Sequence, residues 1–338
     1  MPAAWVGLLA VARRHRYRSH MRESEIDRGG RVLRVRDAGD PGGAVVVYFH
    51  GTPGSRLDLC VGEQLAAEHG VRLVTFDRPG YGGSIPAPFG LASIAADAHA
   101  ITDELGIARF ATLGLSGGGP GALAAAAVPG GRVTRVGVAS GAGPFQHVPG
   151  ALSQLDDNDR AAVALLPGDP AGAAAGFEPL VELFRASDGA GIVSALQDLL
   201  SPRDSELLRD PRIAAGFIET EREGLRPGTS GAGWDNVSWA GEWDIALGAV
   251  TCPVLLWYGS EDRMAPPAHG LWLSQNLARA RLVLRDGPCK SDSSRPAAGA
   301  ESSPAIMRFT SSLDSDTRSS LASSGVSCTI AVYCDPLA

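Results

Sequence analysis

One serine in the chain stands among glycines in a pattern that can support nucleophilic chemistry. Ser116 lies in the run GLSGG at 114–118, after an apolar stretch at 110–115 and before an alanine-rich stretch at 119–128. A G-x-S-x-G run between a strand and a helix is typical of a sharp turn that exposes a nucleophilic serine. The helix that begins there directs free backbone N–H groups toward developing negative charge. A chance glycine loop is the alternative, since the chain contains 43 glycines.

A second glycine-containing turn, HGTPG at 50–54, follows another apolar run. That run, AVVVYF at 44–49, is typical of a strand buried on both faces. Open parallel sheets build their sites at the carboxyl ends of their strands, so both turns are expected at one edge. An oxyanion hole needs two backbone N–H groups that converge on one point. We predict that Thr52 and Gly117 provide them; a simple Gly/Pro turn is the alternative.

A competing motif lies directly after the serine. Residues 119–124 (GPGALA) fit a loose dinucleotide-binding fingerprint. However, they fall inside the expected helix, and no acidic residue ends the next expected strand at 133–139 to hold a ribose. We therefore expect no dinucleotide, and no motif implies another organic cofactor. The five cysteines lack the spacing of metal ligands or of a redox pair, so we expect no metal.

Strand-like and helix-like segments alternate through most of the chain, which indicates a mostly parallel sheet with helices on both faces. The expected strands are 31–36, 44–49, 71–76, 110–115, 133–139, 253–258 and 280–284. The expected helices are 57–69, 92–105, 119–128 and 267–277.

This alternation divides the chain into a core and three other parts. Residues 145–249 contain no buried strand pattern and have a helical composition, so we expect a helical cap, or lid, inserted over the site. The core is then 29–144 and 250–287, preceded by an extension at 1–28 that begins with a loose amphipathic helix. Residues 288–338 are rich in serine and show no lasting period; we expect them to lie outside the fold and to be removed by limited proteolysis.

Four motifs together resemble the α/β-hydrolase superfamily, and in particular its small-molecule serine hydrolases. HGTPGSR, DRPGYGGS, GLSGGGP and YGSEDRMAP occur in the order and spacing of that family, and the resemblance covers about residues 30–287. It implies the α/β-hydrolase fold, with Ser116 as nucleophile and Asp262 as the acid of a catalytic triad. Glu261 is a rival for the acid, and the G-x-x-D spacing from Gly259 favours Asp262.

The resemblance also implies a histidine base, which the chain lacks at the expected place. The family order is Ser, then Asp, then His, with the histidine after the next strand and commonly in a Gly-His pair. Here the sequence at 286–290 reads DGPCK, and the single histidine after Asp262 is His269, within an expected helix. The other histidines precede the acid: His15, His20, His50, His69, His99 and His147.

A shift of reading frame would explain the missing base. Gly287-Pro288-Cys289 is encoded by GGN-CCN-TGY, and reading one base later gives GNC-CNT-GY, which can spell Gly-His. The serine-rich tail would then be out-of-frame translation. The alternative is a lineage that kept the fold and lost its base. The nucleotide sequence around codons 285–290 separates the two.

Composition indicates which classes of binding partner and which cellular location to expect. The formal net charge is −7, so no overall basic field favours nucleic acid or an anionic membrane. The odd number of cysteines indicates a reducing compartment, and we expect a cytoplasmic protein. Apolar segments of the cap suggest a partly apolar small-molecule substrate, but a hydrophobic core within the cap explains them equally well and is the favoured interpretation. We expect hydrolysis of a small ester, lactone or amide, impaired by the absent histidine; the alternative is a catalytically dead homologue that binds small molecules.

Overall fold

The computed structural model describes residues 20–189, 191, 194, 200 and 202–285. The described residues form a sheet of eight strands in the order β1-β2-β4-β3-β5-β6-β7-β8. Strands β3 to β8 run parallel to one another, and β2 is antiparallel to both β1 and β4. The bounds are β1 His20–Asp27, β2 Val32–Gly39, β3 Ala44–Phe49, β4 Val71–Phe76, β5 Phe110–Leu115, β6 Val133–Ala139, β7 Val254–Gly259 and β8 Ala280–Arg285. The predicted fold class is confirmed.

Strand β1 corrects the expected extension at 1–28, because it is an edge strand of the sheet. Its sequence, HMRESEID, has no apolar pattern, and it pairs along its whole length with β2. Charged pairs connect the two strands: Arg34 bonds Glu23 and Glu25, and Arg36 bonds Glu23. Since an edge strand tolerates charged side chains, hydrophobic periodicity could not reveal it.

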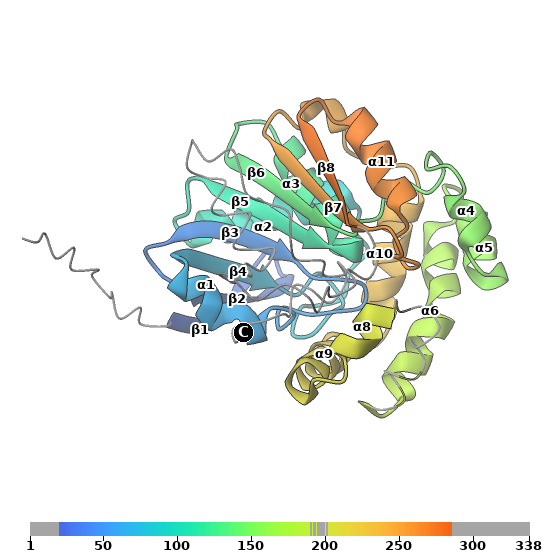
Figure 1. Cartoon of the computed structure of the whole chain (residues 1–338), viewed down its shortest axis with the longest axis horizontal. Coiled ribbons are helices and arrows are strands. Elements are labelled where there is room, and N and C mark those ends of the chain that lie inside the picture. Colours follow the sequence, from blue (N-terminus) through green and yellow to red (C-terminus); the bar gives the residue numbers. More distant parts are fainter. Residues whose placement is uncertain (1–19, 190, 192–193, 195–199, 201, 286–338) are drawn as a thin grey trace, which may run out of the picture.

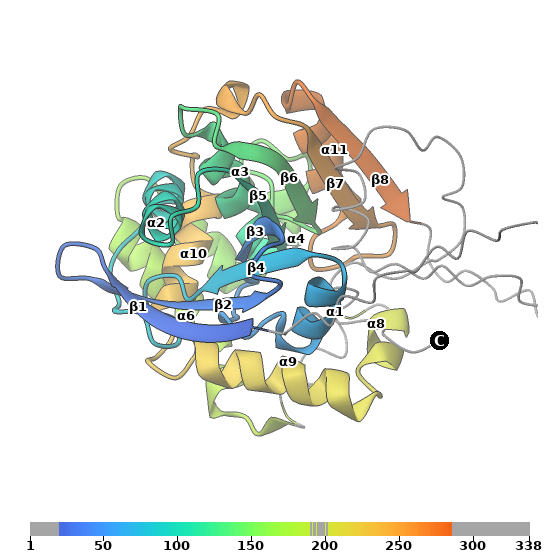
Figure 2. The ribbon, with the colours of Figure 1, turned by 90° about the vertical axis from the view of Figure 1, so that its left-hand side faces the viewer.

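Helices cover both faces of the sheet (Figure 2). The larger core cluster packs α2 (Leu91–Glu104), α3 (Gly119–Ala127) and α11 (Pro267–Asn276) on one face. A smaller cluster includes Ala66 of α1 (Glu63–Glu68) on the opposite face. In the expected helix at 57–69, α1 begins only after Gly62, and a short 3-10 turn precedes it. Cys60 and Cys252 are free thiols that are partly buried.

Between β6 and β7 the described residues form helices and no strand. We call residues 145–249 the helical insertion. It lies on the side to which the arrowheads of β3 and β5 point, that is, over the carboxyl ends of the parallel strands (Figure 1). Its α-helices are α4 Ala151–Gln154, α5 Asp157–Val163, α6 Pro170–Ala186, α8 Pro202–Leu207, α9 Pro211–Gly224 and α10 Ser230–Ala240. Helix α10 contacts the turn that contains Ser116.

The expected tail at 288–338 and the expected helix at the start of the chain lie outside the described residues. Within the described ranges, no helix is both long and apolar enough to cross a bilayer.

Candidate active site

Ser116 lies at the junction of β5 and α3. It follows the last residue of the strand, Leu115, and begins a short 3-10 turn, Ser116–Gly118, that leads into the helix. Its φ is +51°, in the left-handed region that residues other than glycine rarely adopt. The expected sharp turn between strand and helix is therefore confirmed, and its backbone conformation is unusual. Such strained residues are concentrated at functional sites.

The glycines around Ser116 are required by close backbone neighbours. A Cβ atom at Gly114 would overlap the carbonyl of Gly118, and one at Gly118 would overlap the carbonyl oxygens of Phe49 and His50. The end of β3 thus lies directly against the turn that follows β5. This crowding is the physical reason for the glycines in the G-x-S-x-G pattern. It also shows that the two predicted turns, at 50–54 and 114–118, lie against each other.

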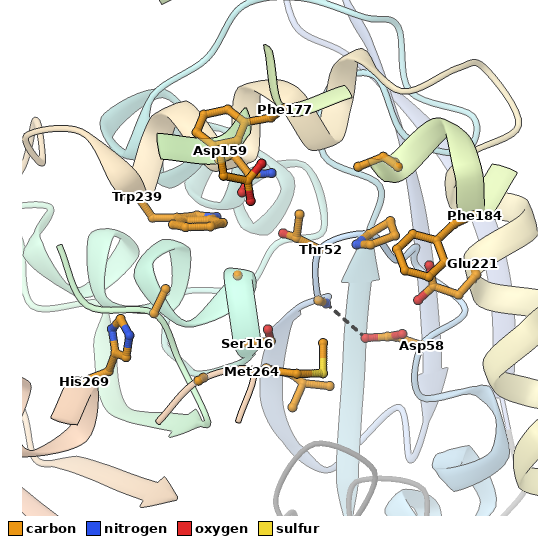
Figure 3. A pocket seen from close by; sticks show the side chains of 18 of the residues that line it. Thr52, Asp58, Ser116, Asp159, Phe177, Phe184, Glu221, Trp239, Met264 and His269 are labelled. Carbon is orange, nitrogen blue, oxygen red and sulfur yellow. Dashed lines mark hydrogen bonds between the residues drawn. The ribbon is translucent and has the colours of Figure 1, made fainter. Parts of the chain in front are cut away.

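A cavity of about 230 Å³ opens above Ser116, between the sheet edge and the helical insertion. Figure 3 shows Ser116 between His269 on one side and Asp58 with Glu221 on the other. Aromatic and aliphatic side chains form much of its wall, among them Phe145, Phe177, Val181, Phe184, Phe217, Trp239 and Met264. The site therefore suits a small, partly apolar molecule.

The two predicted oxyanion donors, Thr52 and Gly117, line this cavity together. They are close neighbours, because a Cβ at Gly117 would overlap the Thr52 hydroxyl. Gly117 lies in the first helical turn, where backbone N–H groups lack intrahelical acceptors. The indole N–H of Trp239 lies beside Gly117; it is buried and has no acceptor among the described residues. Thr52, Gly117 and the Trp239 indole thus lie close together in the wall of the cavity that contains Ser116.

Arg78 and Asp235 hold the Thr52 loop in place. The Arg78 guanidinium donates to the carbonyl oxygens of His50 (2.7 Å) and Gly51 (3.0 Å) and to Asp235 (2.8 Å). Asp235, on α10, also accepts from the Thr52 hydroxyl at 2.7 Å. The sequence contained the DRPG motif but gave no sign that its arginine supports the neighbouring loop.

Asp262 follows β7 and lies at the same sheet edge as Ser116, since β5, β6 and β7 are parallel. It is 8% exposed, whereas Glu261 is exposed to solvent. One Asp262 oxygen accepts from the Ser140 hydroxyl at 2.5 Å, and the other accepts from the amides of Met264 and Ala265. Burial raises the pKa of Asp262, against the lowering effect of these hydrogen bonds.

Ser140 is a site residue that sequence reasoning missed. It follows β6, the strand between those that carry Ser116 and Asp262, and its φ is +46°. Its hydroxyl fixes the orientation of the Asp262 carboxyl. Nothing in the run VASGAG indicated this contact, which depends on the order of strands in the sheet.

His269 lines the cavity but is not arranged as a base. Its Nδ1 accepts the backbone N–H of Gly143 at 2.9 Å, so in the neutral ring Nε2 carries the proton. A base for Ser116 would need a free lone pair on the nitrogen that faces it. Burial lowers the pKa of His269 to about 4, so the ring stays neutral at neutral pH.

The other described histidines serve elsewhere. His50 is fully buried; its Nδ1 donates to the Gly51 carbonyl and its Nε2 accepts the Arg78 amide. Burial and the Arg78 charge hold the pKa of His50 well below its usual value. His99 bonds the carbonyl of Ala125 in the core, and His147 contacts Glu242 at the surface. His20 and His69 are exposed on β1 and after α1.

Three carboxyl side chains line the cavity that sequence reasoning did not single out: Asp58, Asp159 and Glu221. Burial and the charge of Asp58 raise the pKa of Glu221 to about 8. Burial and the charge of Asp156 raise that of Asp159 to about 6. Asp58 lies only a few residues after the predicted oxyanion loop in the sequence. Asp159 and Glu221 belong to the helical insertion, and no sequence motif marked them as site residues. Within the described ranges no cluster of three or more His, Cys, Asp or Glu side chains could hold a metal.

This fold and the turn at Ser116 define a hydrolase of the α/β class. The sequence profile of the alpha/beta hydrolase fold family matches residues 44–291, and the chain belongs to that family. No curated protein matches the chain in sequence.

Three solved structures illustrate the similarity. The enol-lactonase from Burkholderia xenovorans LB400 is 20% identical with a TM-score of 0.56, over 77% of this chain and 90% of that chain. Est816, described as an N-acyl homoserine lactone degrading enzyme, is 18% identical with a TM-score of 0.56, over 78% and 92%. An esterase from Exiguobacterium antarcticum is 21% identical with a TM-score of 0.55, over 78% and 90%. At this level of identity the likeness concerns the fold.

Proposed function

We propose that the protein hydrolyses a small ester, lactone or amide through an acyl intermediate on Ser116. The observation that carries this proposal is the strained turn that presents Ser116 to a cavity beside the unpaired indole N–H of Trp239. The names of two structural neighbours, an enol-lactonase and an N-acyl homoserine lactone degrading enzyme, support an acyl substrate of small size. The apolar wall supports a partly apolar one.

In the proposed reaction the Ser116 oxygen attacks the substrate carbonyl. The negative charge moves to the carbonyl oxygen, where the amides of Thr52 and Gly117 stabilise it. The tetrahedral intermediate then expels the alcohol or amine and leaves an ester on Ser116, which water hydrolyses to the free acid. Asp262 would orient and stabilise a histidine that moves the proton in each step. The helical insertion would act as the lid that excludes bulk water.

The chain as written should perform this chemistry poorly. Neither His269 nor His50 has a free lone pair directed to Ser116, and no histidine follows His269 in the sequence. A serine hydroxyl near neutral pH is a weak nucleophile without an adjacent base. The same observation supports the second candidate function, a catalytically dead homologue that binds a small molecule in the cavity.

Prolonged incubation with p-nitrophenyl butyrate tests the proposal. We expect the butyryl group to accumulate slowly on Ser116, detected by intact mass and peptide mapping, because no base assists its hydrolysis. Ser116→Ala should abolish this modification, and Ser274→Ala on α11 should not. A butyryl group found only on other residues, or equal modification of the Ser116→Ala variant, would refute the role of Ser116 and favour the binding protein.

We propose the cytoplasm as the location. The partly buried Cys252 is a free thiol, which suits a reducing compartment.

A further inference from the structure

Glu221 is a buried carboxyl that faces the cavity and has no hydrogen-bond partner among the described residues. It lies on α9, is 7% exposed, and forms no side-chain hydrogen bond with any described residue. Phe184 and Val181 of α6 belong to the same wall, and Figure 3 shows the carboxyl between Phe184 and Asp58. An unpaired buried carboxyl is costly, so a protein that keeps one at a cavity wall commonly uses it for a ligand.

Asp58, the neighbour of Glu221, is by contrast well paired. Its carboxylate accepts from the Tyr48 hydroxyl (2.7 Å), the Gly51 amide (3.2 Å) and the Thr220 hydroxyl (3.1 Å). These donors stabilise its negative charge. That charge and burial together raise the pKa of Glu221 to about 8, so Glu221 holds a proton at neutral pH while the cavity is empty.

The ionisable side chains that line the cavity are acidic, apart from the neutral His269. Among the described residues, the lining of the cavity includes the carboxyl groups of Asp58, Asp159 and Glu221 and no lysine or arginine. Arg56, a nearby cation of the same loop, is already paired with Asp77, Glu23 and Glu223. A ligand with a carboxylate or phosphate would therefore be repelled, whereas a cation would find an uncompensated acceptor.

We propose that Glu221, with Asp58 behind it, forms a subsite for an ammonium group, so that the substrates are small esters or amides that carry a primary amine. This assignment of substrate class rests on the proposed function of Ser116. The ammonium N–H groups donate to the Glu221 carboxylate, whose proton passes to solvent on binding, and the alkyl part of the substrate lies along the apolar wall. The amine thereby places the substrate with its reacting carbonyl toward Ser116.

Binding of non-reactive probes tests the subsite without any catalytic step. The probes are hexylamine, which is cationic at neutral pH, and 1-hexanol, which has the same chain and no charge. Binding to the full chain is followed by tryptophan fluorescence, because Trp239 lines the same cavity. We expect hexylamine to bind about tenfold or more tightly than hexanol, as a charge-assisted hydrogen bond in a buried site implies. Calorimetry in two buffers of different ionisation enthalpy should show proton release with hexylamine only.

Glu221→Gln supplies the decisive comparison, because it keeps the shape and removes the charge. This variant should bind hexanol as the unaltered chain does and lose the tenfold preference for hexylamine. Glu219→Gln makes the same chemical change at an exposed position of the same helix and should keep the preference. Equal binding of the two probes by the unaltered chain, or an unchanged preference in Glu221→Gln, would overturn the subsite.

The result can be separated from that on the proposed function. A preference for hexylamine in a chain that is never acylated on Ser116 would retain the ammonium subsite and refute the hydrolase. Acylation of Ser116 without a preference for hexylamine would support the hydrolase and refute the ammonium subsite.

Discussion

Arg78 and Asp235 form a buried ion pair that connects the loop after β4 to helix α10 of the helical insertion. Each is about 1% exposed, and both oxygens of Asp235 accept from the guanidinium. The same aspartate accepts from Thr52, and the same arginine holds the carbonyl oxygens of His50 and Gly51. The insertion is therefore bonded to the loop that supplies a proposed oxyanion donor, and its position affects the site directly.

Asp235→Asn should destabilise the protein strongly. The substitution keeps the size of the side chain but leaves the buried Arg78 charge uncompensated, and removing one partner of such a pair costs about 3–5 kcal/mol. Urea unfolding followed by circular dichroism measures the change. Asp157→Asn, at an exposed pair with Arg160, should cost at most about 1 kcal/mol. A similar small loss in both variants would show that the buried pair contributes little.

Gly118→Ala should disrupt the turn at Ser116. The added methyl group would overlap the carbonyl oxygens of Phe49 and His50, and backbone atoms of a central strand cannot move aside cheaply. We expect a loss of at least about 2 kcal/mol in unfolding free energy and slower acylation of Ser116. Gly248→Ala is the matched control, because nothing lies within 4 Å of its Cβ position. Equal stability of the two variants would contradict the crowding argument.

Glu221 should make the folded protein less stable as the pH rises. Its folded pKa of about 8 lies above the ordinary value of 4.5, so between these values the folded state binds more protons than the unfolded state. Stability present below pH 4.5 is therefore lost as the pH rises toward 8. Relative to the unaltered chain, Glu221→Gln should gain about 2 kcal/mol or more between pH 5 and 8. Asp58 and Asp159 are the other carboxyl groups of the cavity and remain in both proteins. Thermal or urea unfolding across this range measures the difference; a constant difference would contradict it.

His269 should make the folded protein less stable as the pH falls, which is the opposite pH dependence to that of Glu221. Its folded pKa of about 4 lies below the ordinary 6.5, so the folded state binds fewer protons between these values and stability is lost as the pH falls from 6.5 toward 4. The amide oxygen of Asn in His269→Asn can replace Nδ1 as the acceptor for the Gly143 amide. This variant should therefore not show the loss of unfolding free energy between pH 6.5 and 4, which is on the order of 3 kcal/mol in the unaltered chain. Nitrogen NMR shifts should show the Nε2–H tautomer at neutral pH. An Nδ1–H tautomer would reopen His269 as a candidate base.

Restoring a base should restore hydrolysis. Replacing the chain from residue 288 onward by the frame-shifted reading should raise kcat/KM for p-nitrophenyl butyrate by about 10²–10⁴-fold or more, because general-base catalysis supplies that factor and the triad acts as a unit. The restored activity should depend on Ser116, whereas the slow turnover of the unaltered chain should barely change in Ser116→Ala. Rapid turnover by the unaltered chain that requires Ser116 would contradict the absence of a base.

The sequence by itself determined the features that arise from local packing and chain order. The bounds predicted for the strands at 44–49, 71–76, 110–115 and 133–139 match the structure, because strands buried on both faces appear as continuous apolar runs. The turn at Ser116 was predictable for a similar reason: its strain and the crowding between Gly114 and Gly118 involve residues close in the chain, whereas the crowding of Gly118 by Phe49 and His50 is a tertiary contact. Alternation of strands and helices then placed Ser116 and Asp262 at one edge.

Only the tertiary structure decided how distant residues meet at the cavity. Thr52 and Asp235 are 183 residues apart, and Asp58 and Thr220 are 162 apart, so no periodicity links them. The edge strand β1 was missed because its charged residues are stabilised by partners on β2 rather than by burial. The tautomer of His269 depends on one amide, that of Gly143, which reaches the ring only because β6 and β7 are neighbours in the sheet. Contacts of this kind follow from the relative positions of packed elements, which a local pattern of residue types does not specify.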